Sequence, residues 1–84
     1  MAKILNKTEM AEMAVYEFEL QAAMADYLRS AGRIGLEAMK KIYKRVTGDD
    51  YTRTDSCGHC QLTLQKFVAR WYFETKEYNE AHKK

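Results

Sequence analysis

Proline is absent from this chain of 84 residues, and glycine occurs only four times. Both residues interrupt helices, so the chain has few helix breakers. The stretches between the glycines are filled mainly by Ala, Glu, Lys, Leu, Met, Gln and Arg, which are the best helix formers. The composition therefore predicts an all-α fold.

Long hydrophobic runs are absent as well. The longest are only a few residues, as at Trp71-Tyr72-Phe73, whereas a helix needs ~20 apolar residues to cross a bilayer. Residues 1–6 carry one charge and too short an apolar run for a secretory signal. We therefore expect a cytoplasmic protein without membrane contact, in which the two cysteines are reduced thiols.

The length allows one hydrophobic core, and thus a single helical domain over residues 1–84. With 46% hydrophobic and 31% charged residues, the chain can bury that core and still face water, which argues against disorder. We expect the two ends, about 1–5 and 79–84, to fray.

Three segments show the hydrophobic spacing of helices, over about 6–31, 35–46 and 56–78. The link between the first two segments is short, so they should form a helical hairpin. We predict a three-helix arrangement in which this hairpin packs on the C-terminal helix.

Local residues support these boundaries. Asn6 and Glu9 have the spacing of a capping box at the start of the first helix. Other residues suited to helix ends are Gly32, Gly48 and either Asp55 or Ser56. The residues expected to face the core are Met10, Met13, Leu20, Met24 and Tyr27/Leu28, then Leu36, Met39, Ile42/Tyr43 and Val46, then Cys60, Leu64, Phe67/Val68 and Trp71.

The most distinctive motif is Cys57-Gly58-His59-Cys60, at the start of the third predicted helix. A structural zinc ion needs four ligands, so two thiolates and an imidazole here would need His82 or a second chain. As a redox pair, the two cysteines would have the spacing found in thioredoxin. The sequence around them, however, lacks the strand–helix–strand pattern of that fold. We favour a third interpretation, in which Cys60 is a buried core residue and Cys57 the more reactive thiol. We thus predict no metal or other cofactor; if zinc binds, the ligands are Cys57, Cys60, His59 and His82.

Aromatic residues are crowded late in the third helix. Three consecutive rings, Trp71, Tyr72 and Phe73, cannot all point into one small core, because neighbouring helix positions are about 100° apart. Trp71 lies on the predicted core face, so Tyr72 or Phe73 should lie at the surface or against another chain. Methionines 10 and 13 add adaptable apolar surface. The predicted interaction residues are Tyr72, Phe73, Met10 and Met13, and the chain is expected to form a homo-oligomer.

The middle of the chain is basic, with six Lys and Arg against three Asp and Glu over residues 33–54. The residues that could bind phosphates are Lys40, Lys41, Lys44, Arg45 and Arg53. Neighbouring acidic residues dilute this patch, and the loop over 48–56 is too long for a helix-turn-helix. A solvated helix face is the preferred interpretation, and nucleic-acid binding is the alternative.

Enzyme motifs are missing from the sequence. It has no glycine-rich phosphate loop and no Gly-x-Ser-x-Gly elbow, and neither of its two histidines has a carboxylate partner at a regular spacing. We therefore expect a protein that is not an enzyme.

The segment from Ile42 to Phe73 reads as a helix ending in Ile-Tyr-Lys-Arg-Val-Thr-Gly, then Ser-Cys-Gly-His-Cys, then an amphipathic helix ending in Trp-Tyr-Phe. It resembles short uncharacterised helical proteins of bacteriophages and prophages with a Cys-x-x-Cys motif. The resemblance implies action in the host-cell cytoplasm as a virion or assembly accessory, a nucleic-acid handler or an inhibitor of a host defence enzyme. With the surplus of apolar surface, this setting predicts a non-enzymatic protein-interaction module that binds a partner protein. The alternative is a small nucleic-acid-binding protein, with a zinc-stabilised fold as a variant.

Overall fold

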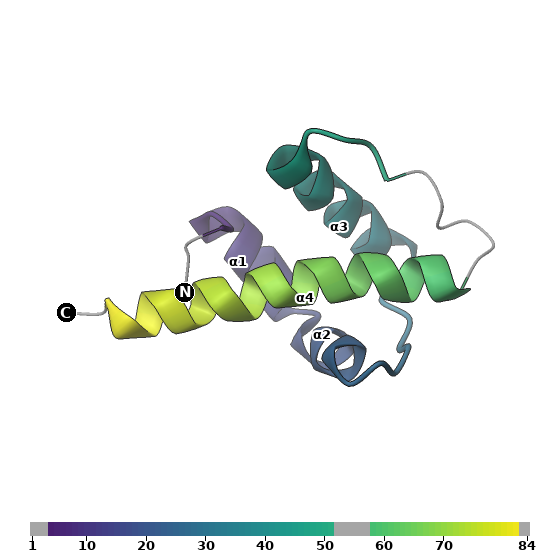
Figure 1. Cartoon of the computed structure of the whole chain (residues 1–84), viewed down its shortest axis with the longest axis horizontal. Coiled ribbons are helices and arrows are strands. Elements are labelled where there is room, and N and C mark those ends of the chain that lie inside the picture. The colour runs from purple at the N-terminus through teal and green to yellow at the C-terminus, as the bar shows by residue number, and fades with distance from the viewer. Residues whose placement is uncertain (1–3, 52–57, 83–84) are drawn as a thin grey trace.

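The computed structural model describes residues 4–51 and 58–82, and four α-helices make up most of this part of the chain (Figure 1). In chain order they are α1 (Lys7–Ala14), α2 (Glu17–Met24), α3 (Gly32–Thr47) and α4 (Gly58–Ala81). No strand occurs in these ranges, so the prediction of an all-α fold is confirmed. None of the helices found there is long and apolar enough to cross a membrane. Predictions for the cap at Asp55 or Ser56, the thiol of Cys57 and the side chain of Arg53 lie outside the described residues.

Helix α4 forms the axis of the molecule. Its 24 residues extend over about 36 Å, along the longest dimension of a body that measures 44 × 26 × 19 Å. Figure 1 shows α3 and α2 packed on different sides of α4, and α1 adds a smaller contact. Packing of the first two predicted segments on the C-terminal helix is thereby confirmed. Both segments are held by α4, since α2 and α3 have little direct contact within the described ranges.

The chain enters α1 through the predicted capping box. The Glu9 N–H donates to the Asn6 side chain at 2.8 Å, and the Asn6 N–H donates to Glu9 Oε1 at 2.9 Å. The same carboxylate binds Arg45 of α3 through two bonds, Nε to Oε2 at 2.5 Å and Nη2 to Oε1 at 2.6 Å. One glutamate therefore closes the start of α1 and ties that helix to α3.

Both ends of the described chain make contacts or form helical structure. The N–H groups of Ile4 and Leu5 both donate to Thr75 Oγ1 of α4, at 2.9 and 3.0 Å, and Leu5 is 1% exposed. Arg45 Nη2 donates to the carbonyl oxygen of Ile4 at 2.7 Å. At the other end α4 continues to Ala81, beyond the predicted end at 78. Residues 4 and 5 thus contact α4 and residues 79–81 continue the helix, while the expected fraying of the ends stays a prediction.

The first predicted helix, over 6–31, is divided in the structure. Helices α1 and α2 are separated by Val15 and Tyr16, whose N–H groups bond to carbonyls three residues back instead of four. Leu20 is buried in α2, but Met24, one turn later at the end of this helix, is 52% exposed, although the periodicity predicted Met24 in the core. Packing explains the break: the Tyr16 ring occupies the space beside Gly35, where a Cβ would stand 2.8 Å from a ring carbon.

Helix α2 also ends earlier than predicted. Asp26 has a left-handed φ of 60°, and the N–H groups of Asp26 and Tyr27 bond back to carbonyls of α2 at 2.9 and 2.8 Å. This is a Schellman closure with aspartate at the position that glycine usually takes. An ion pair with Lys66 of α4 holds the Asp26 side chain. Tyr27 is consequently 65% exposed, and Gly32, the predicted closing residue, opens α3 instead.

Helix α3 follows its prediction closely, spanning Gly32–Thr47 against the predicted 35–46. Gly48 ends it with a left-handed φ of 83°, and its N–H bonds to the Lys44 carbonyl at 2.7 Å. Met39 and Ile42 are buried, as the spacing predicted.

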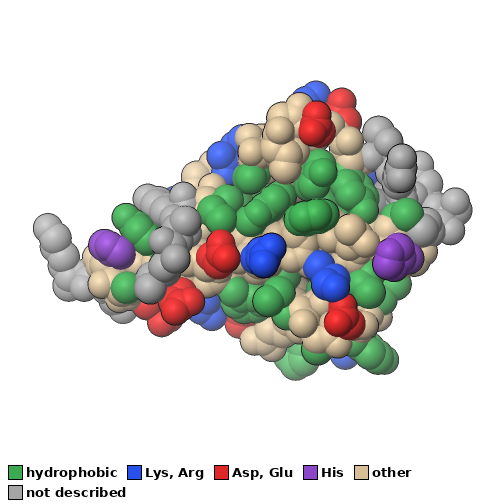
Figure 2. All heavy atoms as spheres, in the orientation of Figure 1, with side chains coloured by type: hydrophobic (Ala, Val, Ile, Leu, Met, Phe, Trp, Pro, Cys, Tyr) green, Lys and Arg blue, Asp and Glu red, His purple; other side chains and the backbone are tan. Residues whose placement is uncertain are grey.

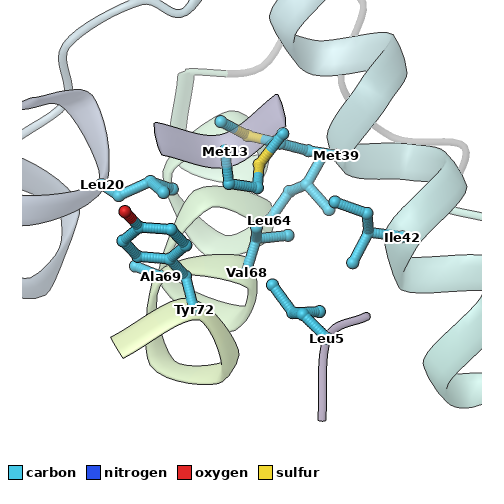
Figure 3. Packing of buried hydrophobic residues seen from close by; sticks show 9 residues of the cluster. All are labelled: Leu5, Met13, Leu20, Met39, Ile42, Leu64, Val68, Ala69 and Tyr72. Carbon is cyan, nitrogen blue, oxygen red and sulfur yellow. The ribbon is translucent and has the colours of Figure 1, made fainter. Parts of the chain in front are cut away.

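The core lies where the other helices meet α4. Figure 3 shows the side chains that form it, and they are Leu5, Met13, Leu20, Met39, Ile42, Leu64, Val68, Ala69 and Tyr72. The predicted core face of α4 is right for Leu64 and Val68 but wrong for Phe67, which is 40% exposed. Trp71 lies half-buried at the edge of the core and not at its centre. Because helices pack on two sides of α4, the buried face includes Tyr72 and extends away from Phe67.

Candidate functional site

Four aromatic side chains from α3, the loop after it and α4 lie together. The ring centroid of Tyr43 is 5.1 Å from that of Tyr51, 5.8 Å from Phe67 and 6.0 Å from Trp71. Phe67 and Trp71, one turn apart on α4, are 6.0 Å from each other. The Tyr51 hydroxyl donates to the Cys60 carbonyl at 2.6 Å, which fixes its ring against α4. We call these four residues the aromatic ridge.

The aromatic ridge is covered on its inner side only. Phe67 is 40% exposed, and the other three rings are half-buried at the rim of the core. Edge and offset contacts between rings hold them in defined orientations. A partner can therefore bury this surface without ordering it first, which lowers the entropic cost of binding.

A groove of about 420 Å³ lies beside the ridge and is lined by residues of α2 and α4, namely Met24, Thr63, Lys66, Phe67 and Arg70. Met24 supplies exposed apolar surface from the α2 side. Lys66 is paired with Asp26, whereas no acidic group in the described part of the chain is within ion-pair distance of Arg70. The groove thus combines apolar walls with positive charge.

Figure 2 shows this face of the molecule. Hydrophobic side chains gather over the junction of α3 and α4 and again over α2, and Lys and Arg side chains lie on α4 between these groups. A surface of this composition, apolar and aromatic with a basic border, is typical of protein interfaces.

The predicted interaction residues lie elsewhere. Met13 is fully buried and Tyr72 is 3% exposed, so the expectation that they offer surface to a partner is wrong. The Tyr72 ring lies in the core because its hydroxyl reaches α2, where it donates to Glu17 at 2.7 Å. Met10 and Phe73 are half-buried against the same core, and Phe73 packs edge-on against Tyr72 with centroids 5.1 Å apart.

The basic residues of the nucleic-acid alternative are Lys40, Lys41, Lys44, Arg45 and Arg53. Arg45 is held by both oxygens of Glu9, and Lys44 Nζ lies 3.1 Å from Asp50. Lys41 is exposed on α3, Lys40 is half-buried, and Arg53 is outside the described ranges. Acidic residues of the same chain therefore engage two of the predicted phosphate contacts.

Two of the four predicted zinc ligands, His59 and His82, cannot meet in one chain. His59 lies in the first turn of α4 and His82 directly follows its last residue, so about 35 Å of helix separates them. Figure 2 shows the two histidines at opposite ends of the molecule. Cys60 is half-buried, against the prediction of full burial. The residues that the structure describes include no group of three or more His, Cys, Asp and Glu that could hold a metal ion.

The shifted pKa values belong to groups that join helices. Hydrogen bonds from Tyr72 and from Lys76 Nζ, at 2.7 and 2.9 Å, hold the pKa of Glu17 below its ordinary value. Burial and the bond to Glu17 raise the pKa of Tyr72 to about 12. Burial pushes the pKa of Glu9 up, but the hydrogen bonds from Arg45 and from the Asn6 N–H, together with the charge of Arg45, outweigh it, so this pKa is also lowered. These groups join α2 to α4 and α1 to α3.

Sequence reasoning missed Phe67, Arg70 and Met24 as surface residues. A signal was present, because positions 64–73 contain six large apolar residues, more than one core face can bury. Which of them turn outward depends on the sides of α4 that α2 and α3 occupy, and spacing along one helix does not contain that information.

No protein-family model matches the chain, and no curated protein or solved structure is similar to it.

Proposed function

We propose that this chain is a non-enzymatic protein-interaction module that binds a partner protein through the aromatic ridge and the adjoining groove. The observation that carries the proposal is the exposed Phe67 ring, which stands in a group of four rings beside Arg70. A few residues contribute most of the binding energy at protein interfaces, and Trp, Tyr and Arg are enriched among them. An apolar, aromatic surface on so small a protein is the kind that partners cover.

The phage or mobile-element setting implied by the resemblance indicates two kinds of partner. One is a protein of the virion or its assembly machinery, and the other is a host defence enzyme that the module inhibits by covering part of its surface. Either role needs a fitting surface and no catalytic group or cofactor, and would be carried out in the host-cell cytoplasm.

The proposal is tested by capture with matched variants. The immobilised chain is incubated with a lysate of the cell that makes it, and retained proteins are quantified by mass spectrometry. Wild type is compared with Arg70→Glu, with Phe67→Ser and with the control Ile34→Ser, which removes a 79% exposed apolar side chain of α3 away from the ridge. We expect the wild type and Ile34→Ser to retain the same proteins, and the two ridge variants to lose them roughly tenfold or more.

Circular dichroism of each variant checks that it is folded. Equal retention by the wild type and both ridge variants would overturn the proposal. A gel shift with duplex DNA or RNA at physiological salt, lost in Lys41→Glu but kept in Arg70→Glu, would favour the nucleic-acid alternative instead.

A further inference from the structure

Helix α4 has an open stripe between the two helices that pack on its sides. Thr63, Lys66, Phe67 and Arg70 follow one another at the three- and four-residue steps of one helix face, and all four line the groove beside the aromatic ridge. Figure 2 shows Lys and Arg side chains of α4 between the hydrophobic groups over α3 and over α2. The stripe is about 10 Å long, which is two turns of helix and a length that a second helix can contact.

The lining of this groove contains two positive charges and no negative one. The charges are Lys66 and Arg70. Arg70 is exposed and forms no ion pair in the described part of the chain, not even with Glu74, which is one turn further along α4. Apolar surface is supplied by Phe67 and Met24, at 40% and 52% exposed. A ligand that complements this groove therefore combines negative charge with an apolar side chain.

An acidic side chain of the same protein already engages one of the two charges. Asp26, after the end of α2, forms an ion pair with Lys66, although it does not itself line the groove. The side chains of Asp26 and Lys66 are 71% and 47% exposed, and ion pairs between exposed groups contribute little free energy. A carboxylate from another molecule can therefore replace Asp26 at Lys66.

We infer that the groove binds an acidic amphipathic helix of the partner protein, and that Asp26 competes with this helix for Lys66. Lys66 and Arg70 are four residues apart, so about 6 Å, or one turn, separates them along α4. A helix that lies along α4 matches them with carboxylates at positions i and i+4. Its side chain at i+3 is on the same face and, if apolar, packs on Phe67 and Met24. The inference rests on the proposed function, because it names the partner of the same surface.

Nucleic acid complements this groove less well than an acidic helix does. Its phosphates follow one another along the whole backbone, and proteins that bind them present a run of cations. The groove has only two, with Asp26 bonded to one of them and Glu74 a turn beyond the other. The apolar wall at Met24 is buried by a side chain of a helix, whereas a phosphate group gains nothing from it.

Selection from a peptide library tests the chemistry of the ligand. Random helical peptides displayed on phage are selected on the immobilised full chain, and the same library is selected on Arg70→Glu. We expect the peptides enriched on wild type to carry two acidic residues four positions apart with a large apolar residue between them, and to be lost on Arg70→Glu. Enrichment of basic or uncharged peptides, or equal enrichment on both chains, would overturn the inference.

The competing aspartate gives a second test, because its removal should strengthen binding. The affinity of one enriched peptide, labelled with a fluorophore, is measured by anisotropy. Asp26→Asn should tighten binding about two- to fivefold by freeing Lys66, and asparagine tolerates the left-handed turn at this position. Arg70→Gln should weaken binding by about the same factor. Glu80→Gln is the matched control, because it removes an equal charge from an exposed position far along α4 and should leave the affinity unchanged.

Three results would contradict the inference. Equal affinities of wild type and Asp26→Asn would mean that Asp26 does not compete, and an equal gain in Glu80→Gln would mean that net charge alone acts. Displacement of the peptide by a single-stranded oligonucleotide at physiological salt would assign the groove to nucleic acid. Capture separates this inference from the proposed function: if retention of lysate proteins depends on Phe67 and Arg70 but the selected peptides are not acidic, the proposed function stands and this inference fails.

Discussion

At the scale of single residues, Gln65 is the clearest departure from a stable core. It lies in α4, is fully buried, and its amide oxygen and nitrogen have no hydrogen-bond partner among the residues described. An unpaired amide in an apolar core costs about 1–3 kcal/mol relative to its hydrated state. Gln65 therefore lowers the free energy of unfolding at a position where an apolar side chain of the same length would fit.

Gln65→Met should raise the free energy of unfolding by roughly 1–2 kcal/mol, because it keeps the volume and removes the unpaired amide. Gln65→Glu should lower it, because a carboxyl group buried there must give up its charge. Urea denaturation of the three proteins measures both effects. A Gln65→Met chain that is less stable than wild type would show that the amide makes a favourable interaction in solution.

The Tyr72–Glu17 bond predicts a stability difference that depends on pH. The pKa of Tyr72 is raised to about 12 in the folded chain. Its contribution to the free energy of unfolding is therefore present below the pKa of about 10 in the unfolded chain, and it is lost as pH rises through 12. The lowered pKa of Glu17 acts in the opposite range: its contribution is present above about pH 4.3 and is lost as pH falls. The difference in free energy of unfolding between wild type and Tyr72→Phe should therefore be largest between these two pH limits. Melting curves from pH 3 to 11 test this, and a difference that does not change with pH would contradict it.

At the scale of helices, close packing explains a glycine that helix propensity disfavours. Gly35 is buried in α3, and a Cβ there would lie 2.7 Å from the Ala31 Cβ and 2.8 Å from a ring carbon of Tyr16. Alanine is favoured over glycine inside a helix by about 1 kcal/mol. The approach of Tyr16 outweighs that preference, and it also marks the place where α1 gives way to α2.

Gly35→Ala should therefore lower the free energy of unfolding, by roughly 1–3 kcal/mol, as the Tyr16 ring is displaced. Gly58→Ala is the matched control, because its Cβ would meet only Leu28 Cδ2 at an ordinary 3.5 Å. That control should be neutral or slightly stabilising. Thermal melting of both variants checks the pair, and a stabilised Gly35→Ala would mean that Tyr16 is not held at this position.

At the scale of the whole molecule, residues near the N-terminus join distant parts of the fold. Thr75, fully buried in α4, accepts hydrogen bonds from the backbones of Ile4 and Leu5, while Arg45 of α3 reaches the Ile4 carbonyl and Glu9. These bonds connect α1, α3 and the second half of α4. One side chain at position 75 thus holds together segments about 70 residues apart in sequence.

Thr75→Val should lower the free energy of unfolding by about 2–4 kcal/mol, because it leaves one buried and one partly buried backbone donor without an acceptor. Thr75→Ser keeps the oxygen and should retain most of the stability. Hydrogen exchange gives a local measurement: the amides of Ile4 and Leu5 should be protected in wild type and in Thr75→Ser, and exposed in Thr75→Val. Unchanged protection in Thr75→Val would show that these amides are held by another group.

The sequence by itself determined the features that depend on residues within a turn or two of one another. The absence of proline and the long stretches of helix formers led to the all-α class. The capping box at Asn6 and Glu9 and the stop at Gly48 were both predictable, because a helix end is closed by its own neighbouring side chains and backbone. The inward positions of Met39 and Ile42 followed from spacing, since α3 packs with one face only.

The tertiary structure alone decided the features that depend on contacts between distant segments. Val15 and Tyr16 interrupt a good helical pattern because Tyr16 packs against Gly35. The residues around position 15 do not predict that contact, because Gly35 is distant in the sequence. In the aromatic ridge, Tyr43 contacts Phe67 and Trp71. These residues are far apart in the sequence, so local spacing does not predict their contact. Tyr72 is buried and Phe67 is exposed because α2 and α3 occupy two sides of α4. Periodicity along a helix indicates that one face is buried, but it does not indicate which neighbouring helix covers that face.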